Sequence, residues 1–142
     1  MPVKPIPEGF HTVTPFLSVK GIAGLIEFLK TVFGATELMR FLHSDGTVMH
    51  AEVKIGDSIV MMGEAMEGYP VSAAMLYVYV SDADATYQAA LDAGGQSIAE
   101  VTDQFWGDRA GGIEDPTGNK WWIATHVEDV DPEELARRVQ AQ

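Results

Sequence analysis

His50 and Glu52 are the pair of residues whose types and spacing most clearly suggest chemistry. They lie two positions apart in the alternating stretch from Val48 to Ile55, so both side chains would project from one face of a strand. A carboxylate beside an imidazole can orient a general base, and the two groups could also share a metal ion. The alternative is a strand histidine bonded to a neighbour beside a solvated glutamate. The sequence favours that alternative, because nothing nearby completes a site.

A second candidate group is the segment Trp106-Gly107-Asp108-Arg109, which precedes an expected strand. Its indole ring could stack on a ligand while the charged pair binds the ligand's polar groups, since loops on a rigid scaffold often carry such contacts. The same residues could instead tie the loop down, with Trp106 filling the space beneath it. A structural or mixed role is the favoured interpretation.

The composition excludes several kinds of chemistry. The 142 residues include no cysteine, which excludes a cysteine nucleophile, disulfides and a cysteine-based zinc site. No spacing supports a serine triad, and there is no glycine-rich phosphate loop. Nine Lys and Arg against 21 Asp and Glu give a formal net charge of −12. That charge argues against a nucleic-acid partner and suits a cationic ligand.

The sequence also predicts where the protein is located. No apolar run approaches the ~20 residues of a membrane span. The first ten residues lack the apolar core of a signal peptide. We therefore expect a cytoplasmic protein with no membrane partner.

The elements that must position these residues repeat along the chain. Residues 1–11 are expected to form an arm, 12–63 a first module, 64–72 a linker, 73–126 a second module, and 127–142 an acidic segment with a short helix. Each module has the pattern strand, helix, strand, strand, strand. Val80 follows Val19 by 61 residues and Gly94 follows Gly34 by 60, which indicates an internal repeat.

One module is too small to close a core by itself. We therefore predict a single α+β domain in which two βαβββ modules form a mixed sheet that bears a cleft. The expected helix of the first module is the best marked element, because apolar residues recur at three-four spacing from Ile22 to Phe33 and Gly34 follows at the C-cap position.

The order and spacing of these segments resemble the vicinal oxygen chelate superfamily, which includes glyoxalase I, extradiol dioxygenases and bleomycin resistance proteins. The resemblance spans residues 12–125, and the segments that carry it are Ile26 to Gly34, Ile55 to Ser58, Trp106 to Arg109 and Asp115 to Asn119. The Trp-Gly-x-Arg segment and a final Ala-Thr-His look most like the PhnB-like branch. The resemblance implies the glyoxalase/bleomycin resistance fold and a homodimer, with the arm and the C-terminal helix as candidate partner contacts.

Enzymes of that superfamily hold a divalent metal through a His on the first strand and a Glu on the last strand of a module, where the metal acts as a Lewis acid. The corresponding positions here are Thr14, Val60, Met75 and Trp122, and neither they nor their neighbours supply a ligand. We therefore expect no metal and no cofactor. The same register directs six side chains into an apolar cleft: Thr14, Val60, Met62, Met75, Tyr77 and Trp122.

These features favour a metal-free binding protein that holds an aromatic or cationic small molecule, with further ligand contacts at Trp106 and Arg109. Such a protein would not be an enzyme. One alternative is a metal-dependent isomerase, lyase or dioxygenase with displaced ligands such as His50, Glu52 and His11. The other is a non-catalytic interaction module that acts through its acidic face or its C-terminal helix.

Overall fold

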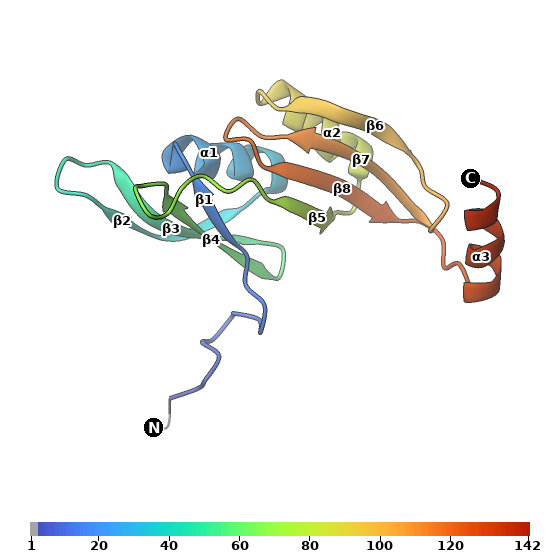
Figure 1. Cartoon of the computed structure of the whole chain (residues 1–142), viewed down its shortest axis with the longest axis horizontal. Coiled ribbons are helices and arrows are strands. Elements are labelled where there is room, and N and C mark those ends of the chain that lie inside the picture. The colour runs from blue at the N-terminus through green and yellow to red at the C-terminus, as the bar shows by residue number, and fades with distance from the viewer. Residues whose placement is uncertain (1–2) are drawn as a thin grey trace. The chain divides into compact units, whose positions relative to one another are not determined.

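A computed structural model describes residues 3–142 of the chain. The chain forms two compact units, the first comprising residues up to Ala74 together with 116–118, and the second Met75–Asp115 with Asn119–Gln142. Each unit contains one four-stranded mixed sheet (Figure 1). The predicted α+β class is confirmed, whereas the predicted cleft between modules stays a prediction.

The first unit contains five elements: β1 (Phe16–Val19), α1 (Ile22–Phe33), β2 (Thr36–Leu42), β3 (Val48–Ile55) and β4 (Ser58–Glu64). The strand order is β1-β4-β3-β2, with β1 parallel to β4 and the other pairs antiparallel. Crossing from β1 to its parallel neighbour requires a long connection, and α1 lies within it. β1 begins at Phe16, because residues 12–15, which were expected to open the first module, continue the arm in the structure.

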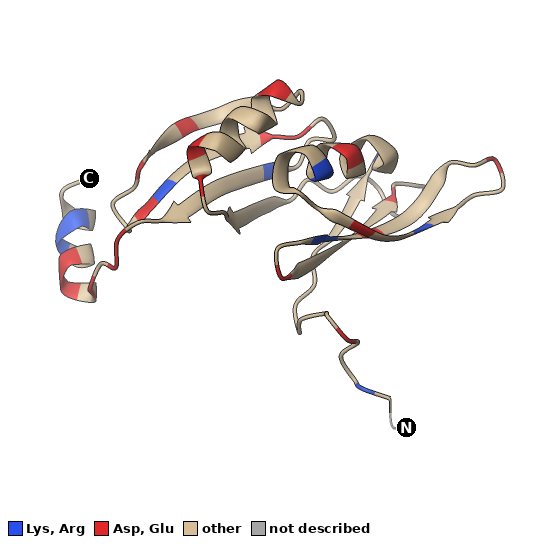
Figure 2. Ribbon diagram, turned by 180° about the vertical axis from the view of Figure 1, so that it is seen from behind, with Lys and Arg blue, Asp and Glu red and all other residues tan. Residues whose placement is uncertain are grey.

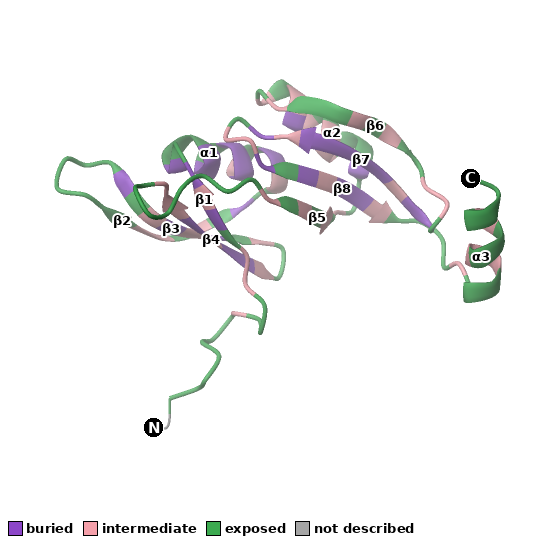
Figure 3. Cartoon of the chain, viewed as in Figure 1, coloured by how far each residue is buried: buried purple, intermediate pink, exposed green. Residues whose placement is uncertain are grey.

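α1 has the bounds that its apolar period predicts. Its apolar face is buried against the sheet (Figure 3), and the residues on that face are Ile22, Leu25, Ile26, Phe28, Leu29 and Val32. Gly34 ends the helix with φ 66°, a left-handed conformation that glycine adopts without strain. Its amide donates to the carbonyls of Leu29 and Lys30.

The second unit contains six elements: β5 (Met75–Tyr79), α2 (Ala83–Asp92), β6 (Gln96–Asp103), β7 (Asp108–Glu114), β8 (Lys120–His126) and α3 (Pro132–Gln140). Its strand order, β5-β8-β7-β6, repeats that of the first unit. The Asp82 side chain caps α2 by accepting from the Ala85 amide. Ile113, Trp121 and Ile123 are fully buried and form the core of this sheet.

α3 has no buried residue, and its Arg138 side chain links it to the rest of the second unit. The Arg138 guanidinium donates to the Phe105 carbonyl and to both carboxylate oxygens of Glu128. These bonds fix the helix to the loop that precedes β7 and to the segment that follows β8. Asp and Glu residues are spread over helices, strands and loops (Figure 2). No helix within residues 3–142 is long and apolar enough to cross a membrane.

Candidate ligand-binding site

The two faces of the first sheet differ in what covers them. Leu17 and Val19 of β1 are buried on the face that α1 covers, whereas Phe16 and Ser18 lie on the other face. We call this second side the open face. Across the strands it carries the row Ser18, Gly63, His50 and Phe41, because these residues pair in sequence from β1 to β2.

The sequence analysis directed Val60 and Met62 into a cleft, and this prediction was wrong. They are 4% and 0% exposed, and Met62 pairs with the buried Leu17. A strand shifted by one residue presents its other face, so Met61 and Gly63 occupy the open face instead. Thr14 precedes β1, and its hydroxyl donates to the His11 carbonyl at 3.0 Å. Thr14 therefore belongs to the arm and not to a strand.

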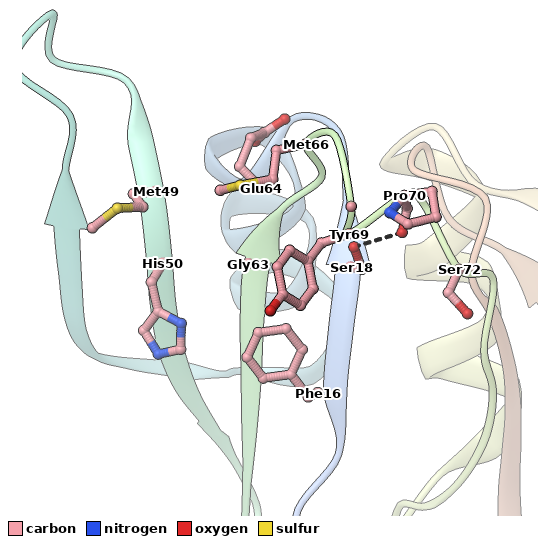
Figure 4. Close-up of a pocket in the computed structure, with 11 residues that line it drawn as sticks. Phe16, Ser18, Met49, His50, Gly63, Glu64, Met66, Tyr69, Pro70 and Ser72 are labelled. Carbon is pink, nitrogen blue, oxygen red and sulfur yellow. Dashed lines mark hydrogen bonds between the residues drawn. The ribbon is translucent and has the colours of Figure 1, made fainter.

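A pocket of about 480 Å³ lies on the open face (Figure 4). Aromatic rings, thioethers and a proline form most of its lining: Phe16, Met49, His50, Met66, Tyr69 and Pro70. Ser18, Glu64 and Ser72 add polar atoms. Adaptable methionines beside rigid rings, with few polar groups, are typical of small-molecule sites.

Gly63 explains how the Phe16 ring enters this pocket. A Cβ added to Gly63 would lie 2.8 Å from Cζ of Phe16, so the ring occupies the space that any side chain would take. Phe16 thereby approaches His50, with 5.8 Å between ring centroids. Phe41 stacks with the same imidazole at 6.1 Å. The imidazole thus contacts two phenylalanine rings.

A bulge explains why Met49 and His50, adjacent in sequence, both line the pocket. Phe41 pairs with His50 and Leu42 pairs with Val48, which leaves Met49 without a partner on β2. An extra residue in one strand redirects the side chains beside it. The bulge therefore places the Met49 thioether in the pocket, whereas regular alternation would direct it to the opposite face of the sheet.

The segment after β4, expected to be a linker, covers one side of the pocket. Met66 and Tyr69 exchange two backbone hydrogen bonds of 2.9 Å. The Ser18 hydroxyl donates to the Pro70 carbonyl at 2.9 Å, and the Ser72 amide donates to the Ser18 carbonyl at 3.2 Å. These bonds hold the segment over β1, so Tyr69 stands beside Phe16 (Figure 4).

Glu64 ends β4 and faces the start of α1. Its carboxylate accepts from the amides of Gly21 and Ile22 at 3.1–3.4 Å. Unpaired amides and the positive end of the helix dipole favour an anion there. The acidic group of the pocket is thus held in place by backbone of the same unit.

The structure brings His50 and Glu52 together, with 3.3 Å between Nε2 and Oε2. Their side chains are only 20% and 16% exposed. A divalent ion usually needs further protein donors. Among residues 3–142 no group of three or more His, Asp and Glu side chains could hold a metal. His11, in the exposed arm, does not complete such a group, so the donors do not fit the metal that family enzymes bind.

Asp108 organises the second sheet. Its Oδ2 accepts from the hydroxyls of Tyr77 and Tyr79 at 2.6 and 2.9 Å and from Nε1 of Trp106 at 3.1 Å. Its Oδ1 lies 2.8 Å from Nδ1 of His126. Burial alone would raise the pKa of Asp108, but these four hydrogen bonds hold it below its ordinary value.

His126 lies between two carboxylates. Its Nε2 is 2.7 Å from Oδ1 of Asp129, opposite the contact with Asp108. Hydrogen bonds to Asp108 and then Asp129 raise the pKa of His126. Burial, with the hydrogen bond to Asp108, raises the pKa of Tyr77 to about 12. The two carboxylates therefore favour the charged form of His126, and the raised pKa values of Tyr77 and Tyr79 favour their phenol forms.

The other sequence-predicted residues of this unit have defined places. Arg109 donates to both carboxylate oxygens of Asp84 at 2.7 and 2.9 Å and to Asp103 at 3.3 Å, which ties β7 to α2 and β6. Trp122 lies against Gly112, where an added Cβ would be 3.2 Å from the indole ring. Met75 is exposed at the start of β5. The structure joins Tyr77 and Trp106 through Asp108, but Arg109 binds other partners.

Comparison with known proteins identifies the class. The family model of the Glyoxalase/Bleomycin resistance protein/Dioxygenase superfamily matches residues 9–123, and the chain belongs to that superfamily. The resemblance seen in the sequence is thus confirmed for the superfamily, while the PhnB-like branch stays a prediction.

The chain is also similar to individual proteins. The chain is 31% identical to the uncharacterized protein Mb0911c of Mycobacterium bovis over 92% of its own length and 93% of that protein's. TioX from Micromonospora sp. ML1 is 26% identical, with a TM-score of 0.67 over 85% of this chain and all of that chain. A glyoxalase-related enzyme from Fulvimarina pelagi is 16% identical, with a TM-score of 0.66 over 81% of this chain and 87% of that chain, which shows the fold alone.

Proposed function

We propose that the protein binds a small aromatic or cationic molecule, without a metal, in the pocket of its first unit. The observation that carries this proposal is the lining of that pocket. Aromatic and thioether groups dominate it, Glu64 is an acidic member, and no Lys or Arg occurs among the described residues that line it. Aromatic faces attract planar rings and organic cations. An anionic ligand would meet no opposite charge.

Exposure of the lining supports the same proposal. Phe16, Met66 and Tyr69 are all exposed, and they lie together on one face. Contiguous exposed apolar groups in a monomer mark binding surfaces more often than solvent-facing structure. The formal net charge of −12 adds long-range attraction for cations.

The test compares three ligands that share one ring system: 1-naphthylmethylammonium, 2-methoxynaphthalene and 2-naphthalenesulfonate. A ligand at a hundred times its Kd stabilises by about 2.7 kcal/mol, which raises the Tm by roughly 3–6 °C for a domain of this size. We expect stabilisation by the cation and the neutral ether. Stabilisation by the sulfonate alone, or by none of the three, contradicts the proposal.

Two variants locate the binding. Gly63→Val places a branched side chain where the Phe16 ring lies and should abolish the Tm shift. Gly24→Ala, in α1, is the matched control, because nothing lies within 4 Å of the added Cβ. It should retain the shift. Equal shifts in both variants would place the ligand elsewhere.

A homodimer, which the family resemblance implies, and a cytoplasmic location belong to this proposal as predictions. Light scattering coupled to gel filtration tests the first: we expect twice the 15.4 kDa chain mass. Elution at the monomer mass over a wide range of protein concentration contradicts it.

A further inference from the structure

The imidazole of His50 is a polar group of the pocket whose hydrogen-bonding role is set by a neighbour. Nε2 of His50 faces the Glu52 carboxylate at 3.3 Å. An ionised carboxylate only accepts hydrogen bonds, so Nε2 must carry the hydrogen. In a neutral imidazole the other nitrogen then carries none and acts as an acceptor. Nδ1 of His50 is therefore an acceptor.

The orientation of that acceptor is also set. The His50 ring contacts the rings of Phe16 and Phe41. Its hydrogen bond to Glu52 opposes rotation of the imidazole ring. In Figure 4 the ring nitrogen next to the carbon that carries Cβ, which is Nδ1, lies on the side of Gly63 and Tyr69. Within residues 3–142, Nδ1 has no hydrogen-bond partner, although the His50 side chain is only 20% exposed.

Other polar groups of the pocket are less able to select a ligand. The Ser18 hydroxyl is used on the Pro70 carbonyl, and the Glu64 carboxylate on the amides at the start of α1. Tyr69 is 72% exposed, and its hydroxyl, which Figure 4 shows on the side of Phe16, can either donate or accept. An acceptor that is fixed and partly buried discriminates more strongly than a mobile hydroxyl in water.

We infer that His50 makes the pocket selective for aromatic molecules that carry an O–H or N–H donor on the edge of the ring, such as phenols and N–H heterocycles. The ring lies among Phe16, Met66 and Tyr69, and its donor bonds to Nδ1 of His50. Glu52 is a positioning residue, because it acts only through the tautomer of the imidazole. This inference rests on the proposed binding function and specifies the ligand class of the same pocket.

The experiment measures Kd by isothermal titration at pH 8. The probes are 2-naphthol, which has the donor, and 2-methoxynaphthalene, which lacks it. One hydrogen bond changes affinity by about five- to tenfold. We expect the wild-type protein to bind 2-naphthol tighter by that factor. His50→Phe retains a ring between the two phenylalanines but has no acceptor, and should bring the ratio close to one.

His43→Gln is the control, because His43 is an exposed histidine outside the pocket. It should keep the wild-type ratio. Equal affinity of wild-type protein for both probes would overturn the selectivity while leaving the proposed binding function intact. An unchanged preference in His50→Phe would also overturn it. If neither probe binds wild-type protein, the selectivity fails as well, and the wild-type measurement decides the matter even where a variant does not fold.

Discussion

The Tyr77 hydroxyl lies 2.6 Å from Oδ2 of Asp108, a carboxylate that is 2% exposed. Two tyrosines, an indole and an imidazole all donate to this one group. A buried carboxylate is tolerated only when it is well hydrogen-bonded. The four side chains therefore depend on Asp108 for their positions, and Asp108 depends on them for its charge.

Asp108→Asn should be strongly destabilising. The amide cannot accept four bonds as a carboxylate does, and it removes the charge that faces His126. Hydrogen bonds to a charged group contribute about 1.5–3 kcal/mol each, so we expect a loss of about 3 kcal/mol in the free energy of unfolding. Urea denaturation measures it. Asp57→Asn, at an exposed turn, is the control. Similar losses in both variants would contradict the role of Asp108.

Stability should depend on pH with a defined sign. The folded-state pKa of His126 is raised, so its contribution is complete below the unfolded value of about 6.5 and is lost as pH rises through the folded value. The pKa of Asp108 is lowered, so its contribution is present above about 3.9 and is lost on further acidification. Unfolding midpoints in urea from pH 3 to 9 should therefore be highest between these limits. In His126→Gln the alkaline decline should be smaller, and an unchanged decline would exclude His126 as its source.

Gly107→Ala should destabilise the protein more than Gly68→Ala. Both glycines have positive φ, 102° and 86°. A Cβ on Gly107 would also lie 2.2 Å from the Glu128 carbonyl oxygen, whereas nothing lies within 4 Å of one on Gly68. We expect Gly68→Ala to lower the free energy of unfolding by about 1 kcal/mol, because it adds backbone strain alone. Gly107→Ala should lower it by about 3 kcal/mol or more, because backbone must also move. Thermal unfolding compares the two, and equal losses would contradict the close approach.

Metal removal should have no effect. Treatment with a chelator, followed by addition of nickel, zinc, iron(II) or manganese(II), should leave the Tm within about 1 °C of its starting value. A metal at a hundred times its Kd would add about 2.7 kcal/mol. A clear increase with one metal would show that donors beyond His50 and Glu52 complete a site and would support a metal-dependent enzyme.

Arg109→Gln should leave binding in the first-unit pocket unchanged. Its guanidinium is used on Asp84 and Asp103, and all three side chains are at least 36% exposed. Exposed ion pairs contribute little, so the Tm should change by less than about 2 °C. A large loss of affinity for the naphthalene probes would restore Arg109 as a ligand contact.

The sequence predicted the elements better than the pocket. The three-four period of α1 and the alternation of β3 mark their bounds because one side of each element is polar. β4 offers no such contrast: Val60, Met61 and Met62 are all apolar. Nothing in their chemistry indicates which face packs on α1, and the cleft side was placed one residue out of register.

The remaining pocket residues depend on contacts that sequence spacing does not contain. Met49 enters through a bulge, and Tyr69 lies in an aperiodic segment held by Ser18, 52 positions from Pro70. The Asp108 cluster joins residues up to 31 positions apart. A glycine inside an apolar strand was the available signal, because Gly63 indicates the close approach of another group.

Because Gly63 has no side chain, the room in the pocket beside Phe16 depends on the residue at this one position. Met62, its neighbour along β4, belongs to the core, whereas position 63 faces only the pocket. A change there alters the room beside Phe16 without disturbing the packing beneath α1. Single substitutions at residue 63 should therefore change which ligands fit beside Phe16, and a graded series from alanine to serine to valine offers this adjustment to protein engineers.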